Sequence, residues 1–250
     1  LVITQPGPLT ATVSKTDVTC FSANNGTISI TAASGGYGTY EYSINGGTTW
    51  SGLNNFTNLA PGTYDIRIRD ALNTGCVITL DPALPVTQPA VLNAVVSGGN
   101  VTCFGGSDGS ITITNPTGGY GTYEYSINGG GSWQASGVFT GLVPGNYNVR
   151  IRDAAHITCV IVLNNALQIT QPAVLNAVVS ATMVSCNGAN DGRITITAPT
   201  GGYGTYEYSI NGGTSWQASG TFTGLAPDTY DVRIRDGVNP ACVITLNPAL

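Results

Sequence analysis

The stretch "YDIRIRD" at residues 64–70 alternates apolar and charged side chains, and it returns as "YNVRIRD" at 147–153 and "YDVRIRD" at 230–236. Successive side chains of a β-strand point to opposite faces of the sheet. The tyrosine and the two aliphatic residues would therefore share a core face, and the polar residues between them would face water. The stretch thus predicts a half-buried strand that the chain uses three times.

The whole chain repeats with a period of 83 residues. Four sets of residues keep this spacing: Cys20, Cys103 and Cys186; Cys76, Cys159 and Cys242; Trp50, Trp133 and Trp216; Pro6, Pro89 and Pro172. Residues 1–6, "LVITQP", would be the last strand of a preceding repeat. Repeats would follow at 7–89, 90–172 and 173–250, the last without its closing strand. A unit of this length suits one small sandwich domain better than a solenoid coil of roughly 20–47 residues.

Short runs rich in Val, Ile, Thr and Tyr, separated by Gly, Asn and Pro, predict the other strands. In the first repeat these runs lie near residues 9–14, 27–32, 40–44, 48–50, 56–59 and 76–80, the last continuing through "PVTQP". Seven strands per repeat predict an immunoglobulin-like β-sandwich. No helical periodicity of useful length occurs, so the chain is predicted to be all-β. Short junctions would join the three tandem sandwiches into a stiff rod.

Six cysteines fall two per repeat at matching positions, with 55 residues between the members of each pair. An even count at a fixed spacing predicts one disulfide in each repeat. The predicted bonds are Cys20–Cys76, Cys103–Cys159 and Cys186–Cys242. A zinc site would need clustered ligands such as CxxC, so neither a metal nor a cofactor is expected. Disulfides persist in oxidising compartments, which predicts an extracellular location.

A second repeated stretch, "SINGGTTW" at 43–50, returns at 126–133 and 209–216. Its pattern resembles the Asp-box, the short hairpin of sialidase propeller blades, with an asparagine where aspartate is usual. The asparagines are Asn45, Asn128 and Asn211. The residues "NGG" tolerate positive φ, so the stretch predicts a tight reversal between two strands. The tryptophans that end it, Trp50, Trp133 and Trp216, would be core anchors or exposed platforms that contact a glycan.

The charged residues exclude some classes of function. The net charge is −5, from 13 acidic and 8 basic residues without a cluster of either sign, whereas nucleic-acid binding needs concentrated Lys and Arg. No apolar run approaches the roughly 20 residues that span a bilayer. The recurring carboxylates and arginines are expected to form cross-strand ion pairs on one sheet, not a glycosidase cleft. These residues are Glu41, Arg67, Arg69, Glu124, Arg150, Arg152, Glu207, Arg233 and Arg235.

Two further candidates for chemistry have structural interpretations. His156 is the only histidine, and its equivalents in the other repeats are asparagines, so no repeated catalytic histidine exists. The loops "NNG" (24–26), "SDG" (107–109) and "NDG" (190–192) offer too few carboxylates for calcium and are expected to be Asx-type turns. The chain is therefore predicted not to be an enzyme.

The complete repeat resembles those of the SprB-type gliding-motility adhesins. The shared elements are a cysteine followed by a "DGSI"-like turn and strand, then "GGYGTYEYSI", a strand of the form L-x-PG-x-Y-x-V-x-I-x-D, a second cysteine and a terminal "ITQP". The region "TTWSGLNN" is an insertion relative to the simplest family pattern. The resemblance implies a very long adhesin that the type IX route secretes to the outer surface of a gliding bacterium.

Two functions from different classes follow. The first is a structural region of a cell-surface filament, which gives reach and mechanical stability. Its partners would be the neighbouring repeats of the same chain, together with surface polysaccharide or other filament chains. The alternative is a carbohydrate-binding module that gains avidity because it is repeated.

Overall fold

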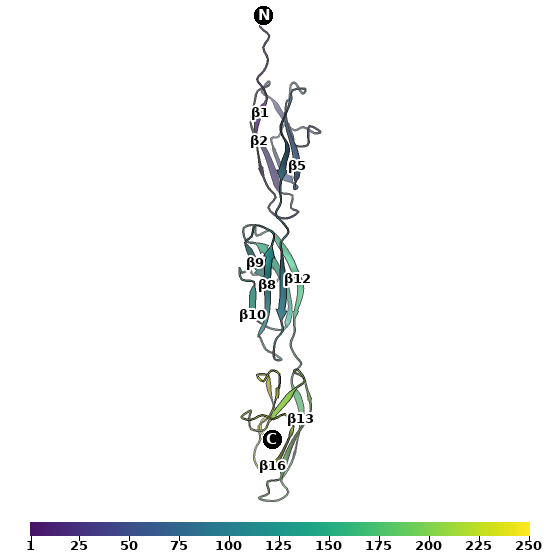
Figure 1. Cartoon of the computed structure of the whole chain (residues 1–250), viewed down its shortest axis with the longest axis vertical. Coiled ribbons are helices and arrows are strands. Elements are labelled where there is room, and N and C mark those ends of the chain that lie inside the picture. The colour runs from purple at the N-terminus through teal and green to yellow at the C-terminus, as the bar shows by residue number, and fades with distance from the viewer. The chain divides into compact units, whose positions relative to one another are not determined.

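A computed structural model describes all residues from 1 to 250, and its only regular elements are β-strands. The strands form antiparallel sheets of three strands each (Figure 1). The chain contains no helix that could cross a membrane. The predicted all-β fold is confirmed.

Each repeat contributes six strands to two sheets. In the first repeat these are β1 (Thr10–Thr16), β2 (Gly26–Ser34), β3 (Tyr40–Ser43), β4 (Asn55–Leu59), β5 (Gly62–Asp70) and β6 (Val77–Val86). In the second repeat they are β7 (Asn93–Gly99), β8 (Gly109–Thr117), β9 (Tyr123–Ser126), β10 (Val138–Leu142), β11 (Gly145–Asp153) and β12 (Val160–Ile169). In the third repeat they are β13 (Asn176–Thr182), β14 (Gly192–Thr200), β15 (Tyr206–Ser209), β16 (Thr221–Leu225), β17 (Val232–Asp236) and β18 (Val243–Asn247).

The strand order of the first repeat is β1-β2-β4 in one sheet and β3-β5-β6 in the other. The orders β7-β8-β10 and β9-β11-β12, and then β13-β14-β16 and β15-β17-β18, repeat it. An immunoglobulin-like sandwich divides its strands in this way, with A, B and E in one sheet and C, F and G in the other. The repeat therefore has an immunoglobulin-like topology without the strand that usually follows C.

The missing strand corrects the expected count of seven. Residues 48–50 form no strand. The returning chain meets β3 only at Ser51, whose backbone exchanges hydrogen bonds of 2.8 and 2.9 Å with Tyr42. The turn that precedes this bridge is closed by its own side chains, described below, so no ladder is needed to hold it.

The core of the first repeat lies between its two sheets. Ile28 and Ile30 of β2 face Ile66 and Ile68 of β5, and all four side chains are fully buried. Burying an aliphatic side chain of this size contributes roughly 1.5–3 kcal/mol. The alternation of β5 thus fixes which face of that strand turns inward, as its sequence predicts.

The third repeat builds its core in the same way. Ile194 and Ile196 of β14 and Val232 and Ile234 of β17 form one buried cluster. The equivalent positions of the two repeats therefore pack alike, 166 residues apart along the chain.

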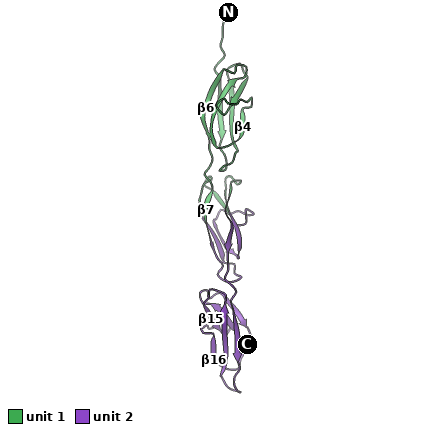
Figure 2. Ribbon diagram, turned by 90° about the vertical axis from the view of Figure 1, so that its right-hand side faces the viewer, with its two compact units in different colours: residues 1–95, 115–125, 150–163 green, residues 96–114, 126–149, 164–250 purple.

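The chain divides into two compact units, which Figure 2 colours separately. The first comprises residues 1–95, 115–125 and 150–163, and the second comprises 96–114, 126–149 and 164–250. Each unit thus contains one repeat together with part of the second repeat. The repeat boundaries at residues 7, 90 and 173 stay a prediction, and residues 1–9 contain no strand.

Candidate functional site

Two disulfides connect successive repeats. Cys20 bonds to Cys159 and Cys103 bonds to Cys242, with Cα atoms 5.3 Å apart and a sequence separation of 139 residues in each case. Each bond lies inside one of the two compact units. Cys76 and Cys186 are free and exposed.

The predicted pairing of Cys20 with Cys76, Cys103 with Cys159 and Cys186 with Cys242 is therefore wrong, and so is the expectation of one disulfide inside each repeat. In the first repeat, Cys76 directly precedes β6, whereas Cys20 lies close to its far end, where Val18 donates to the carbonyl of Thr87. Ten residues of extended strand span roughly 33 Å. Disulfide bonding needs Cα atoms within about 7 Å, so the two thiols of one repeat cannot meet.

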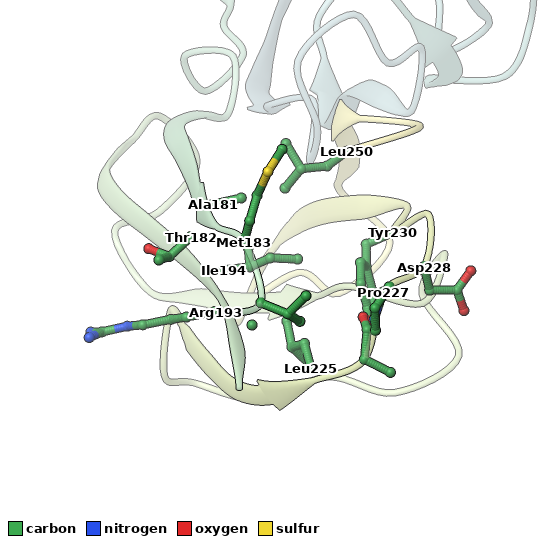
Figure 3. Close-up of a pocket in the computed structure, with 13 residues that line it drawn as sticks. Ala181, Thr182, Met183, Arg193, Ile194, Leu225, Pro227, Asp228, Tyr230 and Leu250 are labelled. Carbon is green, nitrogen blue, oxygen red and sulfur yellow. The ribbon is translucent and has the colours of Figure 1, made fainter. Parts of the chain in front are cut away.

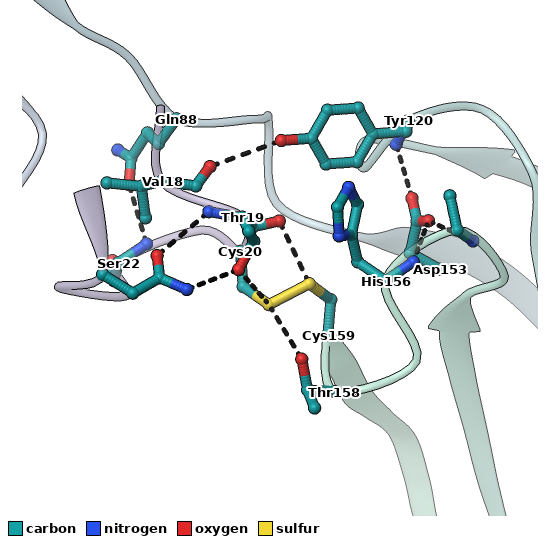
Figure 4. Close-up of a disulfide and its surroundings, with 12 residues drawn as sticks. Val18, Thr19, Cys20, Ser22, Gln88, Tyr120, Asp153, His156, Thr158 and Cys159 are labelled. Atoms are coloured by element: carbon teal, nitrogen blue, oxygen red, sulfur yellow. Dashed lines mark hydrogen bonds between the residues drawn. A yellow bond between two sulfur atoms is a disulfide. The ribbon is translucent and has the colours of Figure 1, made fainter. Parts of the chain in front are cut away.

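Around the first disulfide the two repeats also touch through an aromatic side chain (Figure 4). The Tyr120 hydroxyl donates to the carbonyl of Val18 at 3.3 Å. The Tyr120 ring packs against His156, with 4.4 Å between ring centroids. The Sγ atom of Cys159 lies 3.1 Å from the carbonyl oxygen of Thr19. His156 thus packs at the contact between the first and second repeats, which we call the joint. Tyr120 and Cys159 of the second repeat contact the first repeat there.

The "TQP" segment fixes the loop that carries the first cysteine. The Thr87 amide donates to Oδ1 of Asp17 at 2.7 Å, and the Val18 amide donates to the Thr87 carbonyl at 2.9 Å. The Gln88 side chain then accepts from the Ser22 amide at 2.7 Å. The segment therefore forms hydrogen bonds with its own repeat on both sides of Cys20, to Asp17 and Val18 before it and to Ser22 after it.

The same hydrogen bonds recur on both sides of Cys103, the first cysteine of the second disulfide. The Thr170 amide donates to Oδ1 of Asn100 at 2.8 Å, and the Val101 amide donates to the Thr170 carbonyl at 2.9 Å. Gln171 accepts from the Gly105 amide at 2.7 Å. The 83-residue repeat of the sequence thus produces the same contacts twice.

The loops considered for calcium are turns closed by their own side chains. Asn25 accepts from the Thr19 amide at 3.1 Å, and Asp108 accepts from both the amide and the hydroxyl of Thr102. The Thr102 hydroxyl, followed by its amide, lowers the pKa of Asp108 below the ordinary value. No group of three or more His, Cys, Asp or Glu side chains in the chain could hold a metal ion.

The loop that carries the second cysteine depends on a buried carboxylate. Asp153 is fully buried and accepts from the amides of Tyr120, Ala155 and His156 at 2.5, 2.8 and 3.0 Å. The Cys159 amide in turn donates to the His156 carbonyl at 2.8 Å. One carboxylate therefore positions both the aromatic pair and the cysteine at the joint.

This carboxylate is absent from the residues singled out in the sequence, although a signal for it exists. Asp70 and Asp236 occupy the equivalent positions and are fully buried too. In the first repeat the aspartate has the same strand parity as Ile66 and Ile68, so alternation places it on the core face. The Tyr37 amide, and then those of Asn73 and Leu72, hold the pKa of Asp70 below its usual value despite burial.

The predicted ion pairs fall into two groups. Three arginines contact the glutamate on the neighbouring strand: Arg69 with Glu41 at 2.6 Å, Arg152 with Glu124 at 2.7 Å and Arg235 with Glu207 at 2.7 Å. Register places Glu41 opposite Arg69 and Glu207 opposite Arg235. These pairs are partly exposed, and such pairs contribute at most about 1 kcal/mol each.

The other arginines do not follow the prediction of cross-strand pairing. Arg67 contacts Asp65 at 2.8 Å within β5, and Arg233 contacts Asp231, the residue before β17, at 2.7 Å. The reason is the register, which places uncharged residues opposite Arg67 on both neighbouring strands. Arg150 occupies the equivalent position beside an asparagine, Asn148.

The tryptophans are half-buried, and none of them is fully enclosed. Trp50 lies outside the buried cluster of the first repeat, so it is not a core anchor there. The Arg69 guanidinium covers its ring at 4.4 Å, and Arg235 covers Trp216 at 4.5 Å. Cation–π contacts of this kind use the ring face that a sugar would need.

The hairpin before each tryptophan is held by its asparagine. Oδ1 of Asn45 accepts from the Ser43 hydroxyl at 2.9 Å and from the Thr49 amide at 3.0 Å. Gly46 and Gly47 have φ values of 70° and 88°, as a tight reversal requires. The same bonds recur around Asn128 and Asn211. In this hairpin, hydrogen bonds to the asparagine side chain therefore take the place of the backbone hydrogen bonds that would pair two strands.

These features define a class of protein: a tandem array of immunoglobulin-like β-sandwich repeats whose joints are linked by disulfides. The family model of the SprB repeat matches residues 12–49, 95–132 and 178–215. Each match begins in the first strand of a repeat, includes its first cysteine and ends within the hairpin before the tryptophan. SprB repeats are typical of cell-surface proteins.

No curated protein matches the chain. Among solved structures, the chain is similar to the three N-terminal domains of the bacteriophage RB49 Highly Immunogenic Outer Capsid protein (Hoc). The identity is 11%, 95% of each chain is covered, and the TM-score is 0.39.

Proposed function

We propose that the chain is a structural region of an extracellular adhesin or filament on a bacterial surface, serving gliding motility or attachment. Its task is reach and resistance to mechanical load, and it catalyses no reaction. The three SprB repeat matches support an adhesin-type protein. The disulfides support an extracellular location, because such bonds persist in oxidising compartments.

The observation that carries this proposal is the linkage of successive repeats by disulfides. The shortest covalent path from the N-terminus runs to Cys20 and crosses to Cys159. It then returns to Cys103 and crosses to Cys242, close to the end of the chain. This path contains about 86 residues, so at roughly 3.4 Å per residue it extends to about 290 Å, against about 850 Å for the unlinked chain.

Such linkage suits a load-bearing element. A pulled chain of separate domains lengthens by the full contour of each domain that unfolds. Here the covalent path leaves out most of the chain, so complete unfolding releases far less length than it would in an unlinked chain. The filament thereby keeps its reach under traction, and the lost contacts can re-form when the load falls.

Single-molecule stretching of the 250-residue chain tests this function. With the disulfides intact, the completely unfolded chain should extend to about a third of the length that it reaches after reduction. The double variant Cys20→Ser/Cys103→Ser should behave like the reduced chain. The matched control, Cys76→Ser/Cys186→Ser, removes only the free thiols and should behave like the oxidised chain. Equal extension in oxidised and reduced samples would contradict the proposal.

A further inference from the structure

Each of the two disulfides lines a small cavity. The first cavity, beside Cys20 and Cys159, has a volume of about 200 Å³, and Thr158 is the one hydroxyl-bearing residue of its lining. The second cavity, beside Cys103 and Cys242, has a volume of about 260 Å³ and an apolar lining. A small molecule that enters either cavity therefore meets the sulfur atoms of a disulfide.

A third cavity lies in the third repeat and has a volume of about 410 Å³. Figure 3 shows the apolar side chains around it, among them Ile194, Leu225 and Leu250. Its lining contains no cysteine. The chemistry that follows therefore concerns the first two cavities alone.

In the first cavity, two hydroxyl groups lie beside one sulfur atom. The hydroxyl oxygens of Thr19 and Thr158 are each 3.8 Å from Sγ of Cys20 (Figure 4). A disulfide sulfur carries no proton, so the hydroxyl is the donor in both contacts. The Thr19 oxygen accepts from Nδ2 of Asn25 at 2.6 Å, which leaves its own proton for the sulfur. Cys20 thus has two hydroxyl donors.

The second cavity lacks both donors. Ala241 occupies the position of Thr158. The Thr102 hydroxyl lies 3.9 Å from Sγ of Cys103, but its single proton goes to the carboxylate of Asp108. This aspartate occupies the position of the neutral asparagine in the first repeat, so it also places a negative charge beside the hydroxyl.

These differences act on the charge that thiol–disulfide exchange creates. A thiolate attacks one sulfur and expels the other as a thiolate, and the exchange is faster when the expelled thiolate is better stabilised. Hydroxyl donors stabilise a thiolate on Cys20, whereas a nearby carboxylate disfavours one on Cys103. The partner sulfur of each bond faces a backbone carbonyl oxygen, at 3.1 Å in the first case and 3.3 Å in the second, which opposes negative charge there.

We propose that the first cavity is a reaction site for a small-molecule thiol, which opens the Cys20–Cys159 bond before the Cys103–Cys242 bond. The incoming thiolate enters the cavity and attacks Sγ of Cys159. The bond between the two protein sulfurs breaks, a bond between Cys159 and the small thiol forms, and the electron pair stays on Cys20. The two hydroxyls stabilise that thiolate until the buffer protonates it.

A second molecule of the thiol completes the reduction. Its thiolate attacks the sulfur of the first small thiol, forms a small disulfide and releases Cys159. Two small thiols are thereby oxidised to one disulfide, and the protein disulfide is reduced to two thiols that take up the two protons. The Cys159 thiol can then donate to the carbonyl of Thr19, which lies 3.1 Å away.

This site and the proposed load-bearing function fail separately. Load bearing depends on the presence of the two bonds, whereas this site concerns which of them a thiol opens first. Equal reactivity of the two disulfides would remove the site and leave the load-bearing function untouched.

The test treats the oxidised 250-residue chain with 2-mercaptoethanol under native conditions. Cys76→Ser and Cys186→Ser are present throughout, so that no protein thiol competes. Samples taken over time are quenched with N-ethylmaleimide, and mass spectrometry measures the opened fraction of each disulfide. We expect the first bond to open at least about threefold faster than the second. The first mixed disulfide should carry the small thiol on Cys159 and the maleimide on Cys20.

Variants that exchange the differing side chains are the matched controls. Thr158→Ala with Asn25→Asp gives the first cavity the side chains of the second, and should slow the opening of its bond about threefold or more. Ala241→Thr with Asp108→Asn makes the reverse change and should speed the opening of the second bond. Each new side chain already occupies the equivalent place in another repeat, and circular dichroism checks that the fold is kept.

Three results would overturn the proposal. The first is an equal or faster opening of the second bond in the chain with its natural cavity residues. The second is a folded pair of exchange variants in which the order of opening does not change. The third is a mixed disulfide that carries the small thiol on Cys20 and leaves Cys159 for the maleimide.

Discussion

Asp153 positions the contact between the first and second repeats, although the sequence pattern does not draw attention to it. Its buried carboxylate accepts hydrogen bonds from three backbone amides, including those of Tyr120 and His156. Unpaired burial of a carboxylate would be costly, so these hydrogen bonds are what permit it. A single buried acid thereby couples the fold of one repeat to the geometry of its contact with the repeat before it.

The equivalent acids make stability depend on pH. The Tyr37 amide and its neighbours lower the pKa of Asp70. For Asp236, burial raises the pKa, but the amides of Tyr203, Asn239 and Val238 together outweigh it and leave the pKa lowered. A lowered folded-state pKa gives stability that is complete above the unfolded-state value, about 3.9, and is lost as pH falls through the folded-state value.

We therefore expect the unfolding free energy to stay level from pH 7 to about pH 5 and then to fall with acidification. Chemical denaturation across this range measures it. The Asp70→Asn variant should be less stable at pH 7 and should show a shallower acid dependence. An acid dependence as steep as that of the unaltered chain would assign the effect to other groups.

The environment of the tryptophans predicts whether the chain binds glycans. Because Arg69 and Arg235 each cover a ring face, we expect no saturable binding on a glycan array. Binding that disappears in Trp50→Ala, with the fold intact by circular dichroism, would favour the carbohydrate-binding module instead.

At the scale of elements, one glycine turn ties the start of each repeat to its core. Gly202 donates to the Ala173 carbonyl at 2.9 Å, and the neighbouring Gly201 has a φ of 81°. A Cβ atom at Gly201 would lie 2.0 Å from the carbonyl oxygen of Val174. Gly204 has a similar φ of 87° but open space around it.

These two glycines allow backbone strain and steric clash to be measured separately. Gly204→Ala should cost about 1–2 kcal/mol, the penalty for a left-handed residue with a side chain. Gly201→Ala should cost a further 1–3 kcal/mol, because the turn must move away from Val174. Thermal unfolding of both variants measures the difference. Equal losses would show that the turn does not press on the chain at Val174.

Most strands could be predicted because each is long enough to show alternation between a buried and a solvated face. The exception, residues 48–50, is instructive. Its "TTW" composition favours a strand, but Asn45 satisfies the Thr49 amide with its own side chain, so the backbone there has no need of a ladder. Local side-chain bonding of this kind leaves no periodic signal.

For the whole molecule, the even spacing of cysteines suggests disulfides but does not determine their partners. The sequence did contain the necessary information in its strand order. The first cysteine follows β1 and the second precedes β6, and in this topology those points lie at opposite ends of the sandwich. Counting cysteines by repeat overlooks this, whereas tracing the direction of each strand would reveal it.

The interlocking of repeats also explains why the compact units do not follow the period of the sequence. Residues 115–125 and 150–163, which include Tyr120, Asp153 and Cys159, belong with the first repeat in one unit. Packing and a covalent bond therefore join the leading end of the second repeat to the repeat before it.

The most direct test of this account is peptide mapping of the oxidised chain under non-reducing conditions, with mass spectrometry to identify the linked cysteines. The account predicts one peptide pair that contains Cys20 and Cys159 and another that contains Cys103 and Cys242. Peptide pairs that join Cys20 to Cys76, or Cys103 to Cys159, would place the bonds inside repeats and contradict it.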